Sequence, residues 1–488
     1  MRCDNTYCNP LPIPDIPWGR DSWFSKVEGM FTSDKRPGGV PKMPSYRSIS
    51  DPTVFYWDNK WYLYPSYGMA WVSEDFRTWK HVPTEPECPK YSPGIIPWKN
   101  GFLMTSWNCP LYYSESPLGP FRRLGAFRMS DGSEFVPCDP CLFRDEDGRL
   151  YLYAFHDEPI ENSRFFSSQI YGWELDREDP TRIVRGPFAV LKMDTAAYPF
   201  ERYGSANQNP YFGWVEGPHM IRHNGRYYLI YGAPNTQYDT YCMAVAYSDT
   251  DPLSEFKRQQ RNPLTINRTG FVRGCGHGCV EHGPGNSLWA FYTVAVPYVH
   301  IYERRIGMDK VEIDENGEMY CPGGVTDTPH YAPTSPDAGK DCGVLPLNVW
   351  CRPVASSCAS GRDALYACDG SAFSFWQCAE NDEMPTLTCD LGNPYEVCAA
   401  RIFWRDIGLG YENGIRPQPI RYVIEGSTEE APEDWFLLCD RSDSEDELNI
   451  DYRTFDEKQC RRVRLRITGK PAGITPAVID FTVFGYMK

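Results

Sequence analysis

The sequence lacks any block of basic residues. Its 488 residues include 49 Lys and Arg against 65 Asp and Glu, which gives a formal net charge of −16 at pH 7. A surface with this excess of negative charge repels both a phosphate backbone and anionic lipid headgroups. We therefore expect neither a nucleic acid nor a membrane as a partner.

Long hydrophobic runs are missing too. No stretch approaches the roughly 20 apolar residues that span a bilayer, and the N-terminus (MRCDNTYCNPLPIPDIPWGRD) has no apolar core of the signal-peptide kind. The 19 cysteines are odd in number and scattered, and several lie inside apolar strand patterns, where cysteine behaves as a small buried hydrophobe. These features predict a reduced, cytoplasmic protein. A signal peptide removed from the chain would leave the same pattern, and the protein would then be secreted.

Convincing amphipathic helical patterns are nearly absent, and a recurring hairpin takes their place. Each copy opens with a turn-like pair, continues into an apolar run and reaches a polar turn about nine residues on, before a second strand rich in Tyr, Leu and Trp. Five copies align without a gap, starting at Asp51 (DPTVFYWDNKWYL), Ser92 (SPGIIPWKNGFLM), Asp139 (DPCLFRDEDGRLYL), Glu216 (EGPHMIRHNGRYYL) and His277 (HGCVEHGPGNSLW). Five such hairpins predict a five-bladed β-propeller.

The spacing of the repeats places this propeller within residues 46–330. The repeat starts are separated by 41, 47, 77 and 61 residues, and a four-stranded blade needs roughly 40 to 50. The two long intervals therefore indicate insertions at about 155–210 and 235–270, which we expect to form loops over one mouth of the propeller. Residues 1–45 are rich in Pro and Gly, and we expect them to wrap the outside of the propeller.

The pattern changes beyond residue 330. The Pro-, Asp- and Gly-rich residues 331–345 read as a linker. Residues 346–488 contain short alternating segments such as ARIFWRD, IRYVIEGS and VIDFTVFGY, which predict an antiparallel β-sandwich of the jelly-roll type. The whole chain is thus predicted to be all-β, with a five-bladed propeller followed by a sandwich.

Three of the repeats begin with an acid, at Asp51, Asp139 and Glu216. In a propeller the first residues of each innermost strand face the central axis, so these carboxylates should converge on one polar pocket. Hydrolysis of a glycosidic bond needs one carboxylic acid to protonate the leaving oxygen and one carboxylate to activate water or to attack carbon. A third carboxylate nearby raises the pKa of the acid. Because unpaired carboxylates are costly to bury together, this pattern favours catalysis over three separate turn caps.

These residues resemble the signature of glycoside hydrolase family 43. The resemblance rests on Asp51-Pro52, on Asp139-Pro140 with its trailing Asp145–Gly148 turn, and on Glu216-Gly217-Pro218, and it covers about residues 45–330. It implies a five-bladed propeller that inverts anomeric configuration and acts mostly on α-L-arabinofuranosides and β-D-xylosides. By position, it also implies that Asp51 is the general base, Asp139 raises the pKa of the acid and orients it, and Glu216 is the general acid.

The resemblance extends to Gly276-His277-Gly278, which is similar to the fifth-blade motif of the family. In that family the histidine faces the axis and often supports a calcium ion or a water cluster. His277 is therefore the metal candidate, with calcium as a structural ion and no cofactor required for the chemistry. Candidates for substrate binding near the mouth are Arg304 or Arg305 together with Trp71, Trp107, Phe155, Gln169 and Trp214.

The cysteines near the acids offer a competing hypothesis. Cys138-x-x-Cys141 and Cys275-x-His277-x-Cys279 have spacings that a zinc site uses. Residues three apart in a strand point to opposite faces, however, so the first pair is poorly placed to chelate one ion. The strand pattern therefore disfavours zinc at this position.

The C-terminal segment resembles a discoidin (coagulation factor 5/8 type C) domain over about residues 346–488. The resemblance rests on Cys368–Ser371 with Ser374–Trp376, on Asp390–Gly392, and on the strands that close the chain. Domains of this family often bind carbohydrates through loops at one end of the sandwich. Carbohydrate binding and simple packing against the propeller both remain open for this domain.

Together, these patterns predict an inverting exo-glycosidase that removes terminal pentose residues from plant-type oligosaccharides, as an α-L-arabinofuranosidase, a β-D-xylosidase or both. An endo-arabinanase or a galactose-releasing glycosidase on the same scaffold is one alternative. A catalytically silent carbohydrate-binding protein is another, and the presence of all three acids counts against it. The predicted partner is an oligosaccharide, and the oligomeric state is left open.

Overall fold

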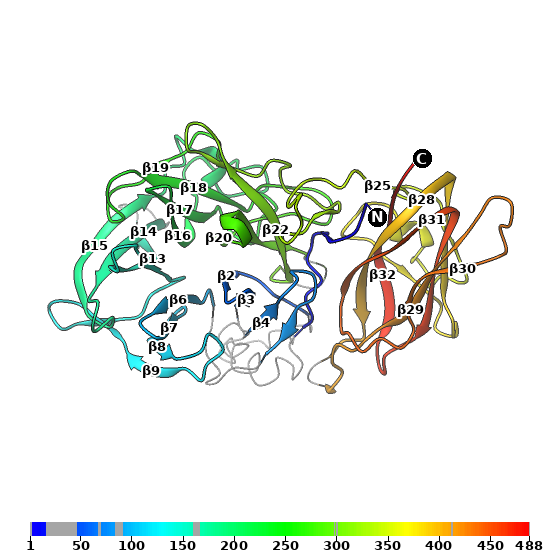
Figure 1. Ribbon diagram of the computed structural model, residues 1–488, viewed down its shortest axis with the longest axis horizontal. Helices are drawn as coiled ribbons and strands as arrows, with labels where there is room; N and C mark the ends of the chain where they lie inside the picture. Colours follow the sequence, from blue (N-terminus) through cyan, green and yellow to red (C-terminus); the bar gives the residue numbers. More distant parts are fainter. Residues whose placement is uncertain are drawn as a thin grey trace, which may run out of the picture.

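The computed structural model describes residues 2–15, 46–66, 70–82, 91–159, 166–296, 298, 301–410 and 413–487. Apart from three short 3₁₀ turns, its regular elements are all β-strands. Figure 1 shows two bodies, a ring of small sheets and a separate sheet domain that carries the C-terminus. The prediction of an all-β chain, with a five-bladed propeller followed by an antiparallel sheet domain, is confirmed.

The propeller consists of five antiparallel sheets of four strands, each in chain order from the axis outward. The innermost strands contact one another around the axis. Blade by blade, the strands are β2 (Thr53–Trp57), β3 (Lys60–Tyr64), β4 (Trp71–Ser73) and β5 (Lys80–His81); β6 (Gly94–Trp98), β7 (Gly101–Thr105), β8 (Leu111–Ser114) and β9 (Arg122–Gly125); β12 (Cys141–Arg144), β13 (Leu150–Pro159), β14 (Phe166–Leu175) and β15 (Ile183–Lys192); β16 (Glu216–His223), β17 (Arg226–Ala233), β18 (Cys242–Ser248) and β19 (Lys257–Arg258); β20 (Gly278–His282), β21 (Leu288–Ala295), β22 (Arg304–Ile313) and β23 (Met319–Tyr320).

Large aromatic side chains fill the space between the blades. Trp61 of β3 and Trp289 of β21 are fully buried in one apolar cluster that joins the first blade to the fifth. Burying a side chain of this size contributes about 2–3 kcal/mol. Packing between these two blades therefore helps to close the ring without a shared sheet.

The long interval after Asp139 contains less loop than expected. Much of it is strand, because β13 and β14 each run for 10 residues. The loop proper is 193–215, which contains the short turn η1 (Pro199–Glu201) and leads directly into β16. In the next blade, β18, β19 and the loop 259–277 fill the interval that begins near residue 235.

A buried ion pair anchors the loop 193–215 to the fourth blade. Glu201 Oε1 lies 2.6 Å from Arg258 Nε and accepts a hydrogen bond of 2.9 Å from the hydroxyl of Tyr231. The Glu201 side chain is fully buried. Separation of this pair would leave a buried charge without its partner, which is costly. The contact therefore holds the loop against the blade.

The N-terminal segment 2–15 lies between the two bodies (Figure 1). Its strand β1 (Thr6–Tyr7) pairs with β24 (His330–Tyr331), and Asn9 exchanges hydrogen bonds with the backbone of Met308 in the fifth blade. This part of the predicted wrapping segment therefore contacts both bodies rather than only the outside of the propeller. Residues 16–45 of that prediction lie outside the described residues.

The C-terminal domain is one antiparallel sheet system whose long strands pair in the order β25-β32-β28-β31-β29-β30. Bulges interrupt the pairing of β28 with both of its neighbours. Trp376, Trp404 and Tyr422 lie in its core. Its elements are β25 (Leu345–Pro346), β26 (Val354–Ala355), η3 (Ala364–Ala367), β27 (Trp376–Gln377), β28 (Thr386–Ile407), β29 (Arg421–Ser427), β30 (Phe436–Arg441), β31 (Ile450–Gly469) and β32 (Thr475–Tyr486).

Buried arginines join the two bodies. Arg401 of β28 pairs with Asp480 at 2.9 Å and donates hydrogen bonds to the carbonyl oxygens of Asn9 (2.9 Å) and Asp327 (2.8 Å). The domain interface thus contains specific polar contacts beside an apolar cluster that includes Phe271 and Phe403. Within the described ranges, no helix is long and apolar enough to cross a membrane. No disulfide joins two of the described cysteines.

Candidate active site

The residues that open the innermost strands have an unusual backbone conformation in common. Their φ angles are positive, at 51° for Asp51, 47° for Ser92, 45° for Asp139 and 35° for His277. Short polar residues and histidine adopt this left-handed region more readily than other side chains. The repeat therefore preserves a backbone turn at the axis, and the polar residue types suit that turn.

The fourth blade departs from the ungapped alignment by one residue. The left-handed residue there is Gly217, with φ 53°, and not Glu216. The hairpin turn agrees, because Asn224 follows Gly217 by as many residues as Asp58 follows Asp51, and both turn residues are again left-handed. Glu216 thus precedes the repeat position, and a bulge follows it in the pairing of β16 with β17.

Gly217 is required where it stands. A Cβ atom at this position would lie 2.7 Å from the ring of His277. The imidazole therefore fills the space that an acidic side chain would need at the equivalent position of the fourth blade. Glu216 supplies the carboxylate from one residue earlier instead.

Asp51 is buried, with an exposed fraction of 5%, and lies in a dense polar shell. One carboxylate oxygen accepts hydrogen bonds from Ser66 (2.7 Å) and Ser50 (3.0 Å), and the other lies 3.1 Å from the Arg304 guanidinium. Burial by itself would raise the pKa of Asp51, but the charge of Arg304, the nearby His277 and the two hydroxyls outweigh it and lower the pKa below its usual range. Asp51 is therefore held as a carboxylate.

Asp139 has fewer partners. Its carboxylate accepts a hydrogen bond of 2.8 Å from the hydroxyl of Ser92, on the neighbouring blade. Burial raises the pKa of Asp139, and the charge of Asp51 adds to this effect, while His277 and Ser92 oppose it. Its protonation is thus coupled to that of the other acids.

Glu216 is held by two hydrogen-bond donors in a buried position. The indole of Trp214 donates to one carboxylate oxygen (3.0 Å), and the hydroxyl of Tyr241 donates to the other (2.7 Å). Burial, followed by the charge of Asp139, raises the pKa of Glu216 to about 7. A carboxyl group with this pKa holds a proton near neutral pH and can release it to a leaving group.

Aromatic side chains surround the acids. Trp107 is half-buried and packs edge-to-face on Tyr91, whose ring centroid lies 5.5 Å away. Phe155 packs edge-to-face on Trp214 at 5.6 Å. Trp214 thus contacts Glu216 directly and Phe155 packs against Trp214. A substrate contact of Trp107, Phe155 or Trp214 stays a prediction.

The other predicted substrate-binding residues have different surroundings. Trp71 is fully buried in the core of the first blade, where its indole donates to the Pro14 carbonyl, so its proposed contact with substrate is wrong. The amide of Gln169 donates to Glu158 (3.1 Å), and no hydrogen bond joins it to an acid of the described site.

The two adjacent arginines are separated by strand alternation. Arg304 reaches the axis, where it contacts both Asp51 and the hydroxyl of Thr236 (3.1 Å). Arg305 points the other way and donates to Asn449 of the C-terminal domain (3.1 Å). Neighbouring residues of a strand face opposite sides, so Arg305 belongs to the domain interface and its prediction as a substrate ligand is wrong.

Among the described residues, the surroundings of His277 show no group of calcium-ligating carboxylate side chains. Its Nδ1 atom lies 3.7 Å from Asp51 Oδ1. Calcium takes six to eight oxygen ligands, and the described residues bring no group of three ligand side chains together at this histidine. Calcium at His277 therefore stays a prediction.

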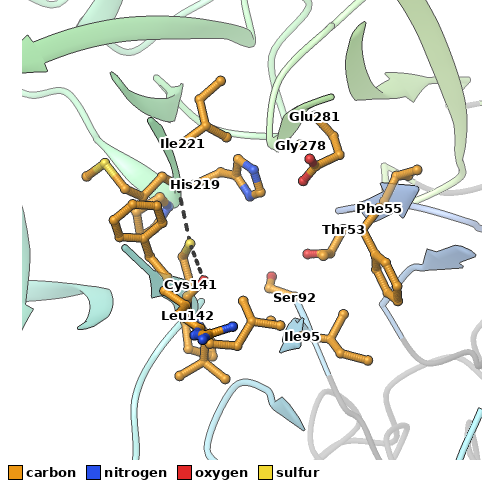
Figure 2. Close-up of a pocket in the computed structure, with 18 of the residues that line it drawn as sticks. Thr53, Phe55, Ser92, Ile95, Cys141, Leu142, His219, Ile221, Gly278 and Glu281 are labelled. Atoms are coloured by element: carbon orange, nitrogen blue, oxygen red, sulfur yellow. Dashed lines mark hydrogen bonds between the residues drawn. The ribbon is translucent and has the colours of Figure 1, made fainter. Parts of the chain in front are cut away.

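A cavity of about 320 Å³ continues along the axis beyond the acids. Asp139, His277 and residues of all five innermost strands line it. In Figure 2 the side chains of Thr53, Ser92, His219 and Glu281 point into it. The propeller is thus hollow at its centre, with the acids grouped where the innermost strands begin.

The zinc hypothesis for the axial cysteines is not supported. The sulfur of Cys141 accepts the backbone N–H of Met220 (3.3 Å), and the sulfur of Cys279 accepts that of Val54 (3.3 Å). Each thiol therefore bridges to the innermost strand of the next blade. Among the described residues, no cluster of metal ligands forms at these positions.

Several residues of the site carried no signal in the sequence. Ser66 and Thr293 bind the side chain or backbone of Asp51, and Tyr241 binds Glu216. None of these lies at a repeat position. Folding of the blade brings Ser66 to Asp51 and Tyr241 to Glu216, and closure of the ring brings Thr293 from the fifth blade to Asp51.

Two protein-family models match separate parts of the chain. The family model described as glycosyl hydrolases family 43 matches residues 44–319, and the F5/8 type C domain model matches residues 354–478. No curated protein sequence matches the chain. One similar solved structure is a thermostable family-43 glycoside hydrolase, 24% identical over 60% of this chain and 98% of that chain, with a TM-score of 0.50.

Two other solved structures cover nearly the whole chain. The GH43 BlXynB protein from Bacillus licheniformis is 15% identical over 99% of each chain. A xylan β-1,4-xylosidase from Bacillus halodurans C-125 is 14% identical over 92% of this chain and 99% of that chain. Both have a TM-score of 0.46.

Proposed function

The chain belongs to glycosyl hydrolases family 43, and from this premise we propose that it is an inverting exo-glycosidase that releases terminal pentose residues from oligosaccharides. Its substrates would be α-L-arabinofuranosides, β-D-xylosides or both. The observation that carries the proposal is the grouping of Asp51, Asp139 and Glu216 at the propeller axis, close enough that their charges act on one another. The pKa values of two of them are shifted in opposite directions. The pKa of Asp51 is lowered and that of Glu216 is raised to about 7, which is how environments divide base and acid roles between two carboxyl groups.

In this mechanism Glu216 donates its proton to the glycosidic oxygen as the bond to the anomeric carbon breaks. Asp51 takes a proton from a water molecule, whose oxygen attacks the anomeric carbon from the opposite face of the sugar. The new carbon–oxygen bond therefore has the inverted configuration. The reaction leaves Glu216 ionised and Asp51 protonated, and a proton exchange with solvent restores both groups.

Asp139 acts on Glu216 through its charge. Ionised Asp139 disfavours a second negative charge nearby, so it keeps the proton on Glu216. The hydroxyl of Ser92 holds the Asp139 carboxylate in place. Asp139 is thus a positioning residue that acts through the acid.

Recognition of the sugar is supported by the walls of the pocket. Trp107 and Trp214 offer aromatic faces, and Arg304 offers donors next to Asp51. The anchored loop 193–215 brings Trp214 and Tyr203 to Glu216, since the charge of Glu216 contributes to the raised pKa of Tyr203. A wall on the side of the acid supports a pocket that accepts a chain end rather than an open groove.

The first test is release of the aryl group from α-L-arabinofuranoside and β-D-xyloside substrates by the wild type, Asp51→Asn and Glu216→Gln. We expect turnover by the wild type, and a loss of about 10²–10⁴-fold in each variant because one proton transfer is removed. Glu281→Gln is the matched control. It changes a half-buried glutamate deeper in the axial cavity, and its turnover should stay near that of the wild type.

The same assay distinguishes the alternatives. Activity that survives in both acid variants, or no turnover on any glycoside, would overturn the assigned pair and favour a silent binding protein. Release only from galactosides, or cleavage only of internal bonds in arabinan, would leave the roles of Asp51 and Glu216 unchanged. It would show, however, that the enzyme does not release terminal pentose residues. Proton NMR of the first product anomer then tests inversion, because a retained configuration contradicts it.

A further inference from the structure

Three cysteine sulfurs meet inside the C-terminal domain. The Sγ atoms of Cys351, Cys368 and Cys389 all lie within 4.8 Å of one another. The sulfurs of Cys368 and Cys389 are 3.7 Å apart. In the part of the chain that the structure describes, this is the one group of three His, Cys, Asp or Glu side chains whose ligand atoms converge so closely.

The cluster joins three separate pieces of chain. Cys389 lies on the long strand β28, Cys368 directly follows η3, and Cys351 lies in the loop between β25 and β26. Cys389 and Cys368 are buried, with exposed fractions of 0% and 3%, whereas Cys351 is half-buried. The group is thus enclosed by the sandwich but open to solvent on the side of Cys351.

An amide group is fixed against two of the sulfurs. The buried Asn348 side chain donates to the sulfur of Cys368 (3.5 Å) and of Cys389 (3.4 Å), and also to the carbonyl of Phe481 (2.6 Å). Its oxygen accepts the backbone N–H of Val483 (2.8 Å), which sets the orientation of the amide. N–H donors to sulfur stabilise the thiolate form and are common partners of metal-bound cysteines.

The distances suit thiolates that share an ion. A Zn–S bond of about 2.3 Å places two sulfurs of a tetrahedral site about 3.8 Å apart, close to the 3.7 Å between Cys368 and Cys389. A disulfide would need about 2.05 Å.

We propose that Cys351, Cys368 and Cys389 bind one thiophilic metal ion, Zn²⁺ or Cu⁺, through three thiolates. Soft sulfur ligands select these ions over Mg²⁺ and Ca²⁺. Each cysteine releases its proton on binding, so affinity rises with pH. On Zn²⁺ a water molecule would complete the four ligands at the open side.

Such an ion would fasten a weakly structured segment. Between β25 and β28 the chain has only the two-residue strands β26 and β27 and the short turn η3. Cys351 and Cys368 belong to this segment, and Cys389 belongs to the central strand. Metal binding would therefore link the segment to the core of the sandwich and stabilise the domain.

The test uses the purified full chain, freed of metal under reducing conditions and titrated separately with Zn²⁺, Cu⁺ and Co²⁺, the last as a spectroscopic probe. We expect about one ion per chain, thiolate-to-cobalt absorption in the near ultraviolet, and a higher unfolding temperature of the metal-bound protein. Cys351→Ser should abolish the absorption and the stabilisation. Cys439→Ser, which removes another half-buried cysteine of the same domain, should change neither.

The variant at Cys351 carries the test because its side chain is partly exposed and the fold tolerates its change best. Titrations with competing chelators decide between Zn²⁺ and Cu⁺. No binding of any of the three ions would overturn the proposal, as would cobalt absorption that survives in Cys351→Ser. A disulfide between two of the three cysteines, found by mass spectrometry of the unreduced chain, would overturn it as well. These readouts are independent of glycosidase activity.

Discussion

At the scale of single residues, the site shows how surroundings divide the work of similar groups. Asp51 and Glu216 are both carboxylic acids near the propeller axis. A guanidinium and two serine hydroxyls surround the first, whereas burial and the charge of Asp139 dominate at the second. The direction of each pKa shift follows from these partners and not from the residue type.

The pH dependence of kcat/KM should follow these shifts. Asp51 must be ionised, and its lowered pKa places the acidic limb below the ordinary value of about 3.9. Glu216 must be protonated, so activity should fall as pH rises through about 7. A rate that stays constant from neutral to alkaline pH would contradict the role of Glu216.

Two neighbours should move the basic limb in opposite directions. Asp139→Asn removes a charge that raises the pKa of Glu216, so the limb should shift to lower pH. Tyr241→Phe removes a hydrogen bond that lowers this pKa, so the limb should shift to higher pH. Profiles of kcat/KM against pH for both variants measure the shifts, and movement in the same direction would show that Glu216 does not set the limb.

At the scale of strands, the first turn of each blade decides which side chains reach the axis. The first, second, third and fifth blades place a polar residue in a left-handed turn. The fourth blade has Gly217 at this position, because the ring of His277 fills the space that a side chain would need. Alternation along β22 likewise sends Arg304 to the acids and Arg305 to the other domain. One residue of register thus separates a site residue from an interface residue.

Gly217→Ala should disturb the site through this contact. Its left-handed backbone costs about 1–2 kcal/mol for an alanine, and the new methyl group would push the His277 ring toward a new position. Gly225→Ala is the matched control, because its φ is also positive but nothing lies within 4 Å of the added atom. We expect similar losses of unfolding free energy in denaturant, and a loss of kcat/KM only at Gly217. Equal activity of the two variants would show that the ring does not depend on this glycine.

At the scale of the whole molecule, the propeller and the C-terminal domain share buried polar contacts. Arg401 of the second body binds Asp480 of its own domain together with backbone carbonyls of segment 2–15 and of the chain after the fifth blade. Arg305 adds a contact in the reverse direction. The two bodies therefore meet through an ordered interface, and the N-terminal segment is part of it.

Removing this arginine should be costly. Arg401→Met leaves the Asp480 carboxylate buried without its partner, and we expect a loss of about 3–5 kcal/mol in unfolding free energy. Arg466→Met is the control, because its pair with Glu425 is partly exposed and is worth at most about 1 kcal/mol. Thermal and denaturant unfolding of both variants measure the difference. Equal losses would show that the buried Arg401–Asp480 pair contributes no more to stability than the partly exposed pair.

The repeats made the fold predictable from sequence because hairpin periodicity and polar turns are local properties of the chain. The same repeats indicated Asp51, Asp139 and Glu216, although the register of the fourth blade was one residue off. Local pattern does not reveal that a bulge follows Glu216, because the ungapped alignment treats all five blades as equal. Pattern also failed for Trp71, since an aromatic residue in a strand fits a core and a sugar pocket equally well.

The sequence by itself determined the number of blades, the all-β architecture and the residues that open the innermost strands, because each depends on neighbours along the chain. Only the tertiary structure decided which partners surround each acid. Ser66, Thr293 and Tyr241 reach the acids from other strands, at sequence separations of 15, 242 and 25 residues. Ser66 and Tyr241 belong to the same blade as the acid they bind, whereas Thr293 comes from the fifth blade and reaches Asp51 only when the ring closes. The hydrogen bonds of Ser66 and Tyr241 lower the pKa of their acids. No local pattern encodes these contacts, because they form only when the strands of a blade pair and the blades meet.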